Sequence, residues 1–117
     1  MIENFGIGID IVNIEKFKKK SFVKNKNFYE KIFSNKEIQY CLKFKNSHEK
    51  FAGKFALKEA LIKSINEKIF FLKIETSHIN SKPVVKLLKF KKKYRFLASL
   101  SHDGNYAIAV VISEEIQ

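Results

Sequence analysis

The chain has 117 residues, of which 45% are hydrophobic and 30% charged, and its formal net charge is +11 at pH 7. This length and composition are typical of one globular domain over residues 1–117, and they exclude a largely disordered chain. The single cysteine excludes an intramolecular disulfide, and there is no zinc-type Cys/His spacing, no apolar run of about 20 residues and no signal-peptide pattern, so we expect a reduced cytoplasmic protein that does not span a membrane.

The positive charge comes from 23 Lys and Arg residues against 12 Asp and Glu residues. Such an excess favours an anionic partner: a nucleic acid, a phosphorylated small molecule or an acidic protein. A drift of the coding sequence towards lysine codons would leave the same excess. The lysines therefore count as evidence only where they gather at a site.

The first predicted element is a β-strand over residues 5–12. Ile7, Ile9 and Ile11 alternate with two glycines and Asp10, and this period of two is typical of a strand.

Four helical stretches are expected after the strand. The first begins near Ile14, the second covers residues 27–33, the third follows Ser34, and the fourth begins after Ser47 and reaches about Asn66. The third has the spacing of a capping box, in which a serine and a glutamate three residues later cap the start of the helix reciprocally.

The periodicity changes after the long helix. Apolar residues then recur in short runs separated by turn-forming residues, which predicts an antiparallel meander. The expected strands cover residues 72–79, 84–88, 96–101 and 106–112. One N-terminal strand, several helices including a long one, and then an antiparallel sheet indicate an α+β fold.

Asp10 stands out because it is charged within an otherwise apolar strand. Its side chain shares a face with Gly6 and Gly8. An unpaired buried carboxylate is costly, so Asp10 must be paired, solvated or bound to a metal. The two glycines leave space beside it for a ligand or for another backbone. A plainer alternative is a strand-end aspartate that faces water or caps the next helix.

The long helix places two further charges at unusual positions. At about 100° per residue, Lys58 falls in the middle of the apolar stripe, and Glu59 falls at its edge near Lys63. A lysine in such a stripe either reaches water along its stem or has a fixed anionic partner. The small Ala52 and Ala56 would leave room around the Glu59 carboxylate. The plainer alternative for Glu59 and Lys63 is a solvated i,i+4 pair.

A strand carboxylate and a helix carboxylate that converge among lysines describe a site for a hard cation that handles phosphate. Mg²⁺ binds few protein carboxylates and takes its remaining ligands from water and substrate phosphates. It neutralises charge on a pyrophosphate during displacement. Two carboxylates without such an ion would repel the pyrophosphate. Asp10 and Glu59 therefore predict a metal site if both line one pocket.

Two segments now resemble a known family. Residues 7–10, Ile-Gly-Ile-Asp, resemble the first signature of the 4′-phosphopantetheinyl transferases, and residues 55–63, Phe-Ala-Leu-Lys-Glu-Ala-Leu-Ile-Lys, resemble the second. The surrounding segments are similar to the short bacterial type, the holo-[acyl-carrier-protein] synthases, and the likeness covers essentially the whole chain. The longer class of this superfamily is a tandem duplication, which 117 residues cannot hold.

The resemblance implies an enzyme that moves 4′-phosphopantetheine from coenzyme A to a serine of an acidic apo-acyl carrier protein in fatty acid biosynthesis. It releases adenosine 3′,5′-bisphosphate and needs Mg²⁺. The resemblance further implies that Asp10 and Glu59 bind the metal, that Lys58 and Glu59 are catalytic, and that Glu59 or a metal-bound water takes the serine proton. The residues that it assigns to coenzyme A are Lys54, Lys63, Lys82, Pro83 and His102.

The resemblance also implies two kinds of protein contact. The first helical stretch would dock on the acidic carrier protein, where complementary charge steers the encounter. The docking lysines would be Lys16, Lys19, Lys20 and Lys24, and the plainer alternative for each is a solvated basic face. The family is a homotrimer with active sites between subunits, so the apolar meander would pack at a three-fold axis.

The chain departs from the family pattern without touching Asp10, Lys58 or Glu59. Lys16 and Lys54 stand where arginine is common, which keeps the charge but loses the planar bidentate fork.

The competing prediction is a small basic nucleic-acid-binding module, for which Asp10 and Glu59 would be dispensable because carboxylates repel phosphate. A relative that binds coenzyme A without catalysis is a third alternative. The sequence has no recognised nucleic-acid-binding motif and no apolar run that would span a membrane, so we expect neither nucleic acid nor a membrane as partner.

Overall fold

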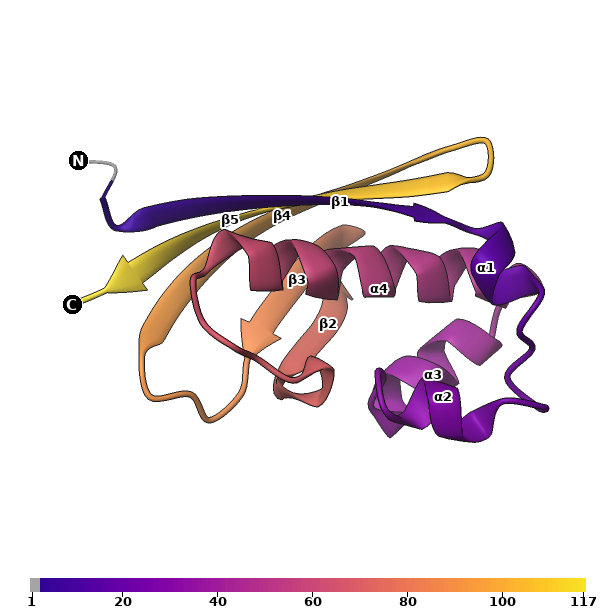
Figure 1. Cartoon of the computed structure of the whole chain (residues 1–117). Coiled ribbons are helices and arrows are strands. Elements are labelled where there is room, and N and C mark those ends of the chain that lie inside the picture. Colours follow the sequence, from indigo (N-terminus) through magenta and orange to yellow (C-terminus); the bar gives the residue numbers. More distant parts are fainter. Residues whose placement is uncertain (1–2) are drawn as a thin grey trace.

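A computed structural model describes residues 3–117, and it places one long helix against a three-stranded antiparallel sheet (Figure 1). The strands are β1 (Phe5–Asn13), β2 (Ile74–Ile79), β3 (Lys82–Leu87), β4 (Lys93–Asp103) and β5 (Tyr106–Ile116). The helices are α1 (Glu15–Lys18), α2 (Lys26–Glu30), α3 (Asn35–Leu42) and α4 (Ser47–Ser64), with a 3₁₀ turn at η1 (Phe71–Lys73). The α+β class expected from the sequence, with one long helix, is confirmed.

The sheet is not a single meander of the last four strands. β2 and β3 form a separate two-stranded hairpin, and the larger sheet has the order β1–β5–β4. The N-terminal strand therefore pairs antiparallel with the last strand, with Phe5 opposite Glu114 and Asn13 opposite Tyr106. Local periodicity cannot predict this pairing, because it depends on which strand edges the helices leave free.

The first helices are shorter than the sequence analysis expected. α1 ends at Lys18, so Lys19 and Lys20 follow the helix instead of lying on it. Phe17 is the only buried residue of α1, and the lysines after it supply no apolar side chain to continue a buried stripe. The α3 start is as predicted: the Ser34 hydroxyl accepts from the Glu37 N–H, and the Ser34 N–H donates to the Glu37 carboxylate at 2.8 Å.

The two glycines of β1 allow it to pack directly on α4. A Cβ atom at Gly6 would overlap the carbonyl oxygen of Ser64, and one at Gly8 would overlap that of Ala60. The alanines of α4, including Ala52 and Ala56, are fully buried. The small side chains of α4 are therefore covered by neighbouring elements of the protein. Of the two alternatives for the glycines, the structure shows the approach of another backbone.

Aromatic residues fill the core at the α1–α3 end of α4, where Figure 1 shows the short helices gathered. Tyr29 and Phe51 have ring centroids 4.6 Å apart, and Phe17 and Phe33 are buried beside them. Edge-to-face contacts of this kind stabilise a core beyond simple burial. Within residues 3–117, no helix combines the length and the apolar character needed to cross a bilayer.

Candidate active site

Asp10 lies on the face of β1 that packs on α4, because it shares that face with Gly6 and Gly8. The close approach of β1 brings its carboxylate to Lys63, whose ammonium group donates to Asp10 Oδ1 at 3.0 Å and to the Ile9 carbonyl oxygen at 3.1 Å. The Asp10 side chain is 13% exposed and that of Lys63 is 52% exposed. The contact therefore lies at the surface, where β1 crosses the helix.

Glu59 lies one helical turn before Lys63 and is close enough to Asp10 to interact with its charge. Burial raises the pKa of Glu59, and the Asp10 carboxylate raises it further, while Lys63 and Lys16 act in the opposite direction. A like charge has this effect because it disfavours a second ionised carboxylate nearby. The two predicted metal-binding residues, from a strand and a helix that are far apart in the sequence, therefore lie near enough for the charge of one to act on the other.

The donor set fits a hard cation with an incomplete protein shell. Among residues 3–117, no group of three or more His, Cys, Asp and Glu side chains is arranged to hold a metal ion. Asp10 and Glu59 could supply two oxygen ligands, and the mutual repulsion of their charges favours a cation between them. Mg²⁺ accepts such an arrangement because it keeps waters and uses substrate phosphates as further ligands.

Lys58 does not face this site. Its ammonium group is completely buried and donates to the Glu37 carboxylate at 2.8 Å, to the Ile32 carbonyl oxygen at 2.7 Å and to the Phe71 carbonyl oxygen at 3.1 Å. Three acceptors use all three N–H groups of a lysine. Of the two alternatives for a lysine in the apolar stripe, the structure shows a fixed anionic partner inside the protein, and a catalytic role of Lys58 stays a prediction.

Glu37 connects three parts of the chain. One carboxylate oxygen accepts from Lys58 and from the Ser34 N–H, and the other accepts from the Thr76 N–H at 2.8 Å and from the Thr76 hydroxyl at 2.6 Å. Sequence reasoning identified Glu37 as a capping residue within a segment that resembles the family, but it assigned Glu37 no partner and gave no signal for Thr76. Because Lys58 requires an acid, the capping glutamate could have been considered as its partner.

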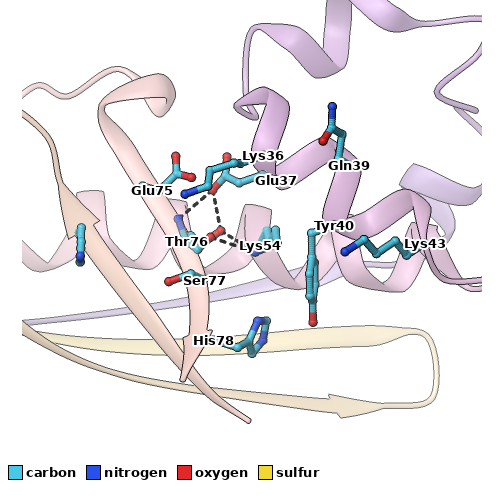
Figure 2. A pocket seen from close by; sticks show the side chains of 11 residues that line it. Lys36, Glu37, Gln39, Tyr40, Lys43, Lys54, Glu75, Thr76, Ser77 and His78 are labelled. Carbon is cyan, nitrogen blue, oxygen red and sulfur yellow. Dashed lines mark hydrogen bonds between the residues drawn. The ribbon is translucent and has the colours of Figure 1, made fainter. Parts of the chain in front are cut away.

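Lys54 lies on the other side of Thr76 and reaches a second site. Its ammonium group donates to the Thr76 hydroxyl and carbonyl oxygens at 3.1 Å each, and it lies 4.8 Å from the centre of the Tyr40 ring. Figure 2 shows Lys54, Thr76 and Tyr40 along one wall of a pocket between α3, α4 and β2. Burial lowers the pKa of Lys54, which nearby acidic groups partly oppose.

This pocket, which we call the lysine pocket, has a volume of about 470 Å³. Its lining includes four lysines and a stacked Tyr40–His78 pair, whose ring centres are 5.3 Å apart. The lysines are Lys36, Lys43, Lys54 and Lys86. Burial lowers the pKa of His78, and the charges of Lys54 and Lys50 lower it further. The pocket combines positive charge with an aromatic surface, which suits a phosphorylated ligand with a planar ring.

The remaining residues assigned to coenzyme A lie near the sheets and not beside Asp10. Lys82 begins β3, and Pro83 pairs with His78 in the hairpin, next to the lysine pocket. His102 is exposed on β4, with its ring close to Gly53 of α4. Within this one chain, therefore, Asp10, Glu59 and Lys63 form one group, and Lys54 and His78 line another.

The predicted docking lysines are all exposed and lie in α1 and the segment before α2. The Lys16 ammonium is 5.3 Å from the centre of the Phe55 ring, and that of Lys20 is 4.2 Å from the Phe28 ring. Lys16 also acts on the charge of Glu59. This basic surface therefore adjoins the two carboxylates. The exposed residues are Lys16, Lys19, Lys20 and Lys24.

Comparison with known proteins gives a consistent result. A family profile described as the 4′-phosphopantetheinyl transferase superfamily matches residues 6–111. The holo-[acyl-carrier-protein] synthase of Mycoplasma mycoides is 37% identical over 97% of this chain and 96% of its own length. One similar solved structure is the crystal structure of the Helicobacter pylori holo-[acyl-carrier-protein] synthase in complex with coenzyme A. Its sequence is 37% identical to this chain, its TM-score is 0.75, and the match covers 92% of this chain and 99% of that chain.

A second solved structure agrees in fold. The Thermotoga maritima holo-[acyl-carrier-protein] synthase is 33% identical, with a TM-score of 0.76 over 95% of this chain. The match spans 64% of that structure's chain.

Proposed function

The chain belongs to the 4′-phosphopantetheinyl transferase superfamily and is an enzyme of its holo-[acyl-carrier-protein] synthase type, and on this basis we propose that it transfers 4′-phosphopantetheine from coenzyme A to a serine of apo-acyl carrier protein. The proposal covers residues 1–117 as a single domain and includes the release of adenosine 3′,5′-bisphosphate. The observation that carries it is the contact of Asp10 with Lys63, at 3.0 Å and one helical turn from Glu59, where β1 crosses α4.

Asp10 and Glu59 are the proposed ligands of Mg²⁺. When bound, this ion would neutralise charge on the diphosphate of the coenzyme and hold it in position for displacement. Lys63 is half-exposed beside both carboxylates, so its ammonium group can reach a phosphate oxygen at the same place. This is a charge-assisted contact, which favours the extra negative charge of the transition state.

The reaction is a displacement at phosphorus. The serine oxygen of the carrier protein forms a bond to the phosphorus that bears the pantetheine arm, and the bond from that phosphorus to the bridging oxygen breaks. The bridging oxygen and its electron pair leave with the adenosine 3′,5′-bisphosphate. We propose that Glu59, or a water molecule that the metal would hold, accepts the serine proton.

The phosphate and adenine groups of the coenzyme are proposed to contact the other assigned residues. Lys54 supports this assignment because it lines the lysine pocket. Lys82 and Pro83 belong to the neighbouring β2–β3 hairpin, and His102 lies near the end of β4. A single chain holds them apart from Asp10. This separation fits an active site that two neighbouring subunits complete.

A homotrimer is proposed for the same reason and because of the open face of the large sheet. The strand side chains opposite α4 form an exposed apolar face that monomers rarely leave uncovered. We call it the open sheet face, and its most exposed members are Ile7, Ile9, Ile11 and Leu97. Covering this face with copies of the same chain would remove the apolar area from water.

The exposed lysines of α1 and the following segment are proposed to bind the acidic carrier protein. Lys16 adjoins Glu59, so a carrier protein held there would present its serine near the two carboxylates. Complementary charge would raise the association rate and set the orientation. We propose that the enzyme acts in the cytoplasm and that the modified carrier serves fatty acid biosynthesis.

The test is the intact mass of apo-acyl carrier protein after incubation with coenzyme A, Mg²⁺ and the enzyme. We expect one phosphopantetheine to be added, and we expect Asp10→Asn and Glu59→Gln to abolish the addition. Glu30→Gln, which changes an exposed acid of α2, is the matched control and should remain active. If the wild-type protein adds nothing to any carrier protein of the same cell, the proposal is wrong.

A further inference from the structure

The ammonium group of Lys63 contacts Asp10, one of the two residues to which the proposed function assigns a metal ion. It lies 3.0 Å from Asp10 Oδ1 and 3.1 Å from the Ile9 carbonyl oxygen. Both acceptors belong to β1, although Lys63 lies one turn after Glu59 on α4 and could have paired with that residue. Among residues 3–117, Asp10 is the residue with which Lys63 forms an ion pair.

The Lys63 ammonium group and a divalent metal ion cannot both bind the Asp10 carboxylate at the same time. Lys63 adds one positive charge to two carboxylates, and a divalent ion would add two. An ion that bound Asp10 would compete with the lysine for the same oxygen atom and would repel its ammonium group. The Lys63 side chain is 52% exposed, so it can turn away without breaking the core. Exposed ion pairs of this kind are weak and break readily.

We propose that Lys63 holds the place of the metal in the ligand-free protein and that it exchanges Asp10 for a phosphate group of the coenzyme when the metal binds. The inference rests on the proposed function, because it uses the metal and the coenzyme assigned there. It adds an order to their binding: the lysine is released from Asp10 by the cation and becomes available to the phosphate.

This exchange couples the two ligands through one side chain. The metal binds more tightly once a phosphate has drawn Lys63 away from Asp10, and the phosphate binds more tightly once the metal has displaced Lys63. Such coupling is reciprocal, so each ligand raises the affinity of the other by the same factor. A lysine that merely lay nearby would weaken metal binding equally with and without the coenzyme.

The test measures Mn²⁺ binding, by electron paramagnetic resonance of the free ion, with and without coenzyme A and without carrier protein. The variant is Lys63→Met, and the matched control is Lys31→Met, which removes an exposed lysine of the α2 end. Without coenzyme A, Lys63→Met should bind Mn²⁺ about fivefold more tightly or better than the wild type. With saturating coenzyme A, this gain should largely disappear, and Lys31→Met should match the wild type in both conditions.

An equal gain with and without coenzyme A, or no gain in either condition, would overturn the exchange while leaving the metal site in place. A wild-type protein that binds no Mn²⁺, or an Asp10→Asn variant that binds it as well as the wild type, would overturn the metal site itself and the exchange with it. A thermal unfolding curve of Lys63→Met that coincides with that of Lys31→Met shows that the comparison is made between folded proteins.

Discussion

Lys58 and Glu37 form a completely buried ion pair, with 2.8 Å between the lysine nitrogen and one carboxylate oxygen and no exposed surface on either side chain. The pair joins α4 to the capped start of α3, and the second carboxylate oxygen joins both to β2 through Thr76. The Lys58 charge, in the middle of the second motif, thus stabilises the packing of the helix that carries Glu59. Lys58 therefore has a structural role in the core, whereas its neighbour Glu59 is a candidate metal ligand.

We expect Lys58→Met to lower the free energy of unfolding by about 3–5 kcal/mol, because it leaves the Glu37 charge buried without its partner. Urea denaturation followed by circular dichroism measures the change. Lys31→Met, on the surface, should stay within about 0.5 kcal/mol of the wild type. A Lys58→Met protein of unchanged stability that had lost transfer activity would show instead that Lys58 contacts the substrate.

The same pair predicts a loss of stability in acid. Burial alone would raise the pKa of Glu37, but Lys58, Thr76 and Ser34 favour its charged form more strongly and hold the pKa below the usual value of 4.5. A carboxyl group with a lowered pKa in the folded protein stabilises it above the unfolded pKa, and this contribution is lost as the pH falls through the folded pKa.

Glu37→Gln should therefore be less stable than the wild type at pH 7, and the difference should shrink steadily below pH 4.5. Urea denaturation at a series of pH values measures it. Glu30→Gln serves as the control for general acid effects, because its carboxylate is exposed. A difference that grew as the pH fell would contradict the assigned role of Glu37.

Gly8→Ala should disturb both the fold and the site. The new Cβ atom would overlap the Ala60 carbonyl oxygen and push β1 away from α4, which we expect to cost about 1–3 kcal/mol of stability. The transfer rate should fall further than stability explains, because Asp10 moves with the strand. Gly53→Ala is the matched control for stability, since its Cβ atom meets the flexible ends of the Leu100 and His102 side chains, at 3.0 and 3.4 Å. It is not a control for the transfer rate, because His102 is assigned to coenzyme A.

Thr76→Val tests the position of Lys54 in the lysine pocket. It removes the hydroxyl that donates to Glu37 and accepts from Lys54 while keeping the side-chain shape. We expect the KM for coenzyme A to rise several-fold with a smaller change in kcat, since a hydrogen bond to a charged group contributes about 1.5–3 kcal/mol. Thr76→Ser should restore the wild-type KM. Equal losses in both variants would argue against a role for the hydroxyl.

Ile9→Glu tests the open sheet face. If three copies cover this face, a buried carboxylate there is costly, and light scattering after gel filtration should show a shift from trimer to monomer. Val23→Glu places the same charge at an exposed apolar residue outside the sheet and should leave the trimer intact. A wild-type protein that elutes as a monomer would refute the proposed assembly.

The sequence by itself determined the features that depend on near neighbours. The alternation of Ile7, Ile9 and Ile11 produced β1 as expected, and the capping box at Ser34 formed with Glu37. The long helix was expected to begin after Ser47 and to reach about Asn66, and it runs from Ser47 to Ser64. Two short motifs, spaced far apart, were sufficient to indicate the superfamily. The strand, the capping box and the helix start each depend on interactions within a few residues, which the order of residues specifies directly.

Tertiary structure alone decided which charges meet. Lys63 could have bonded to Glu59 on its own helix, but β1 brings Asp10 to it because Gly8 lets the strand lie on the α4 backbone. Lys58 could have reached water or phosphate, but the packing of α3 on α4 places Glu37 beside it. These partners lie far apart along the chain, and their pairing depends on how closely whole elements pack. Burial then sets the cost of leaving any of the charges unpaired, which local sequence patterns cannot show.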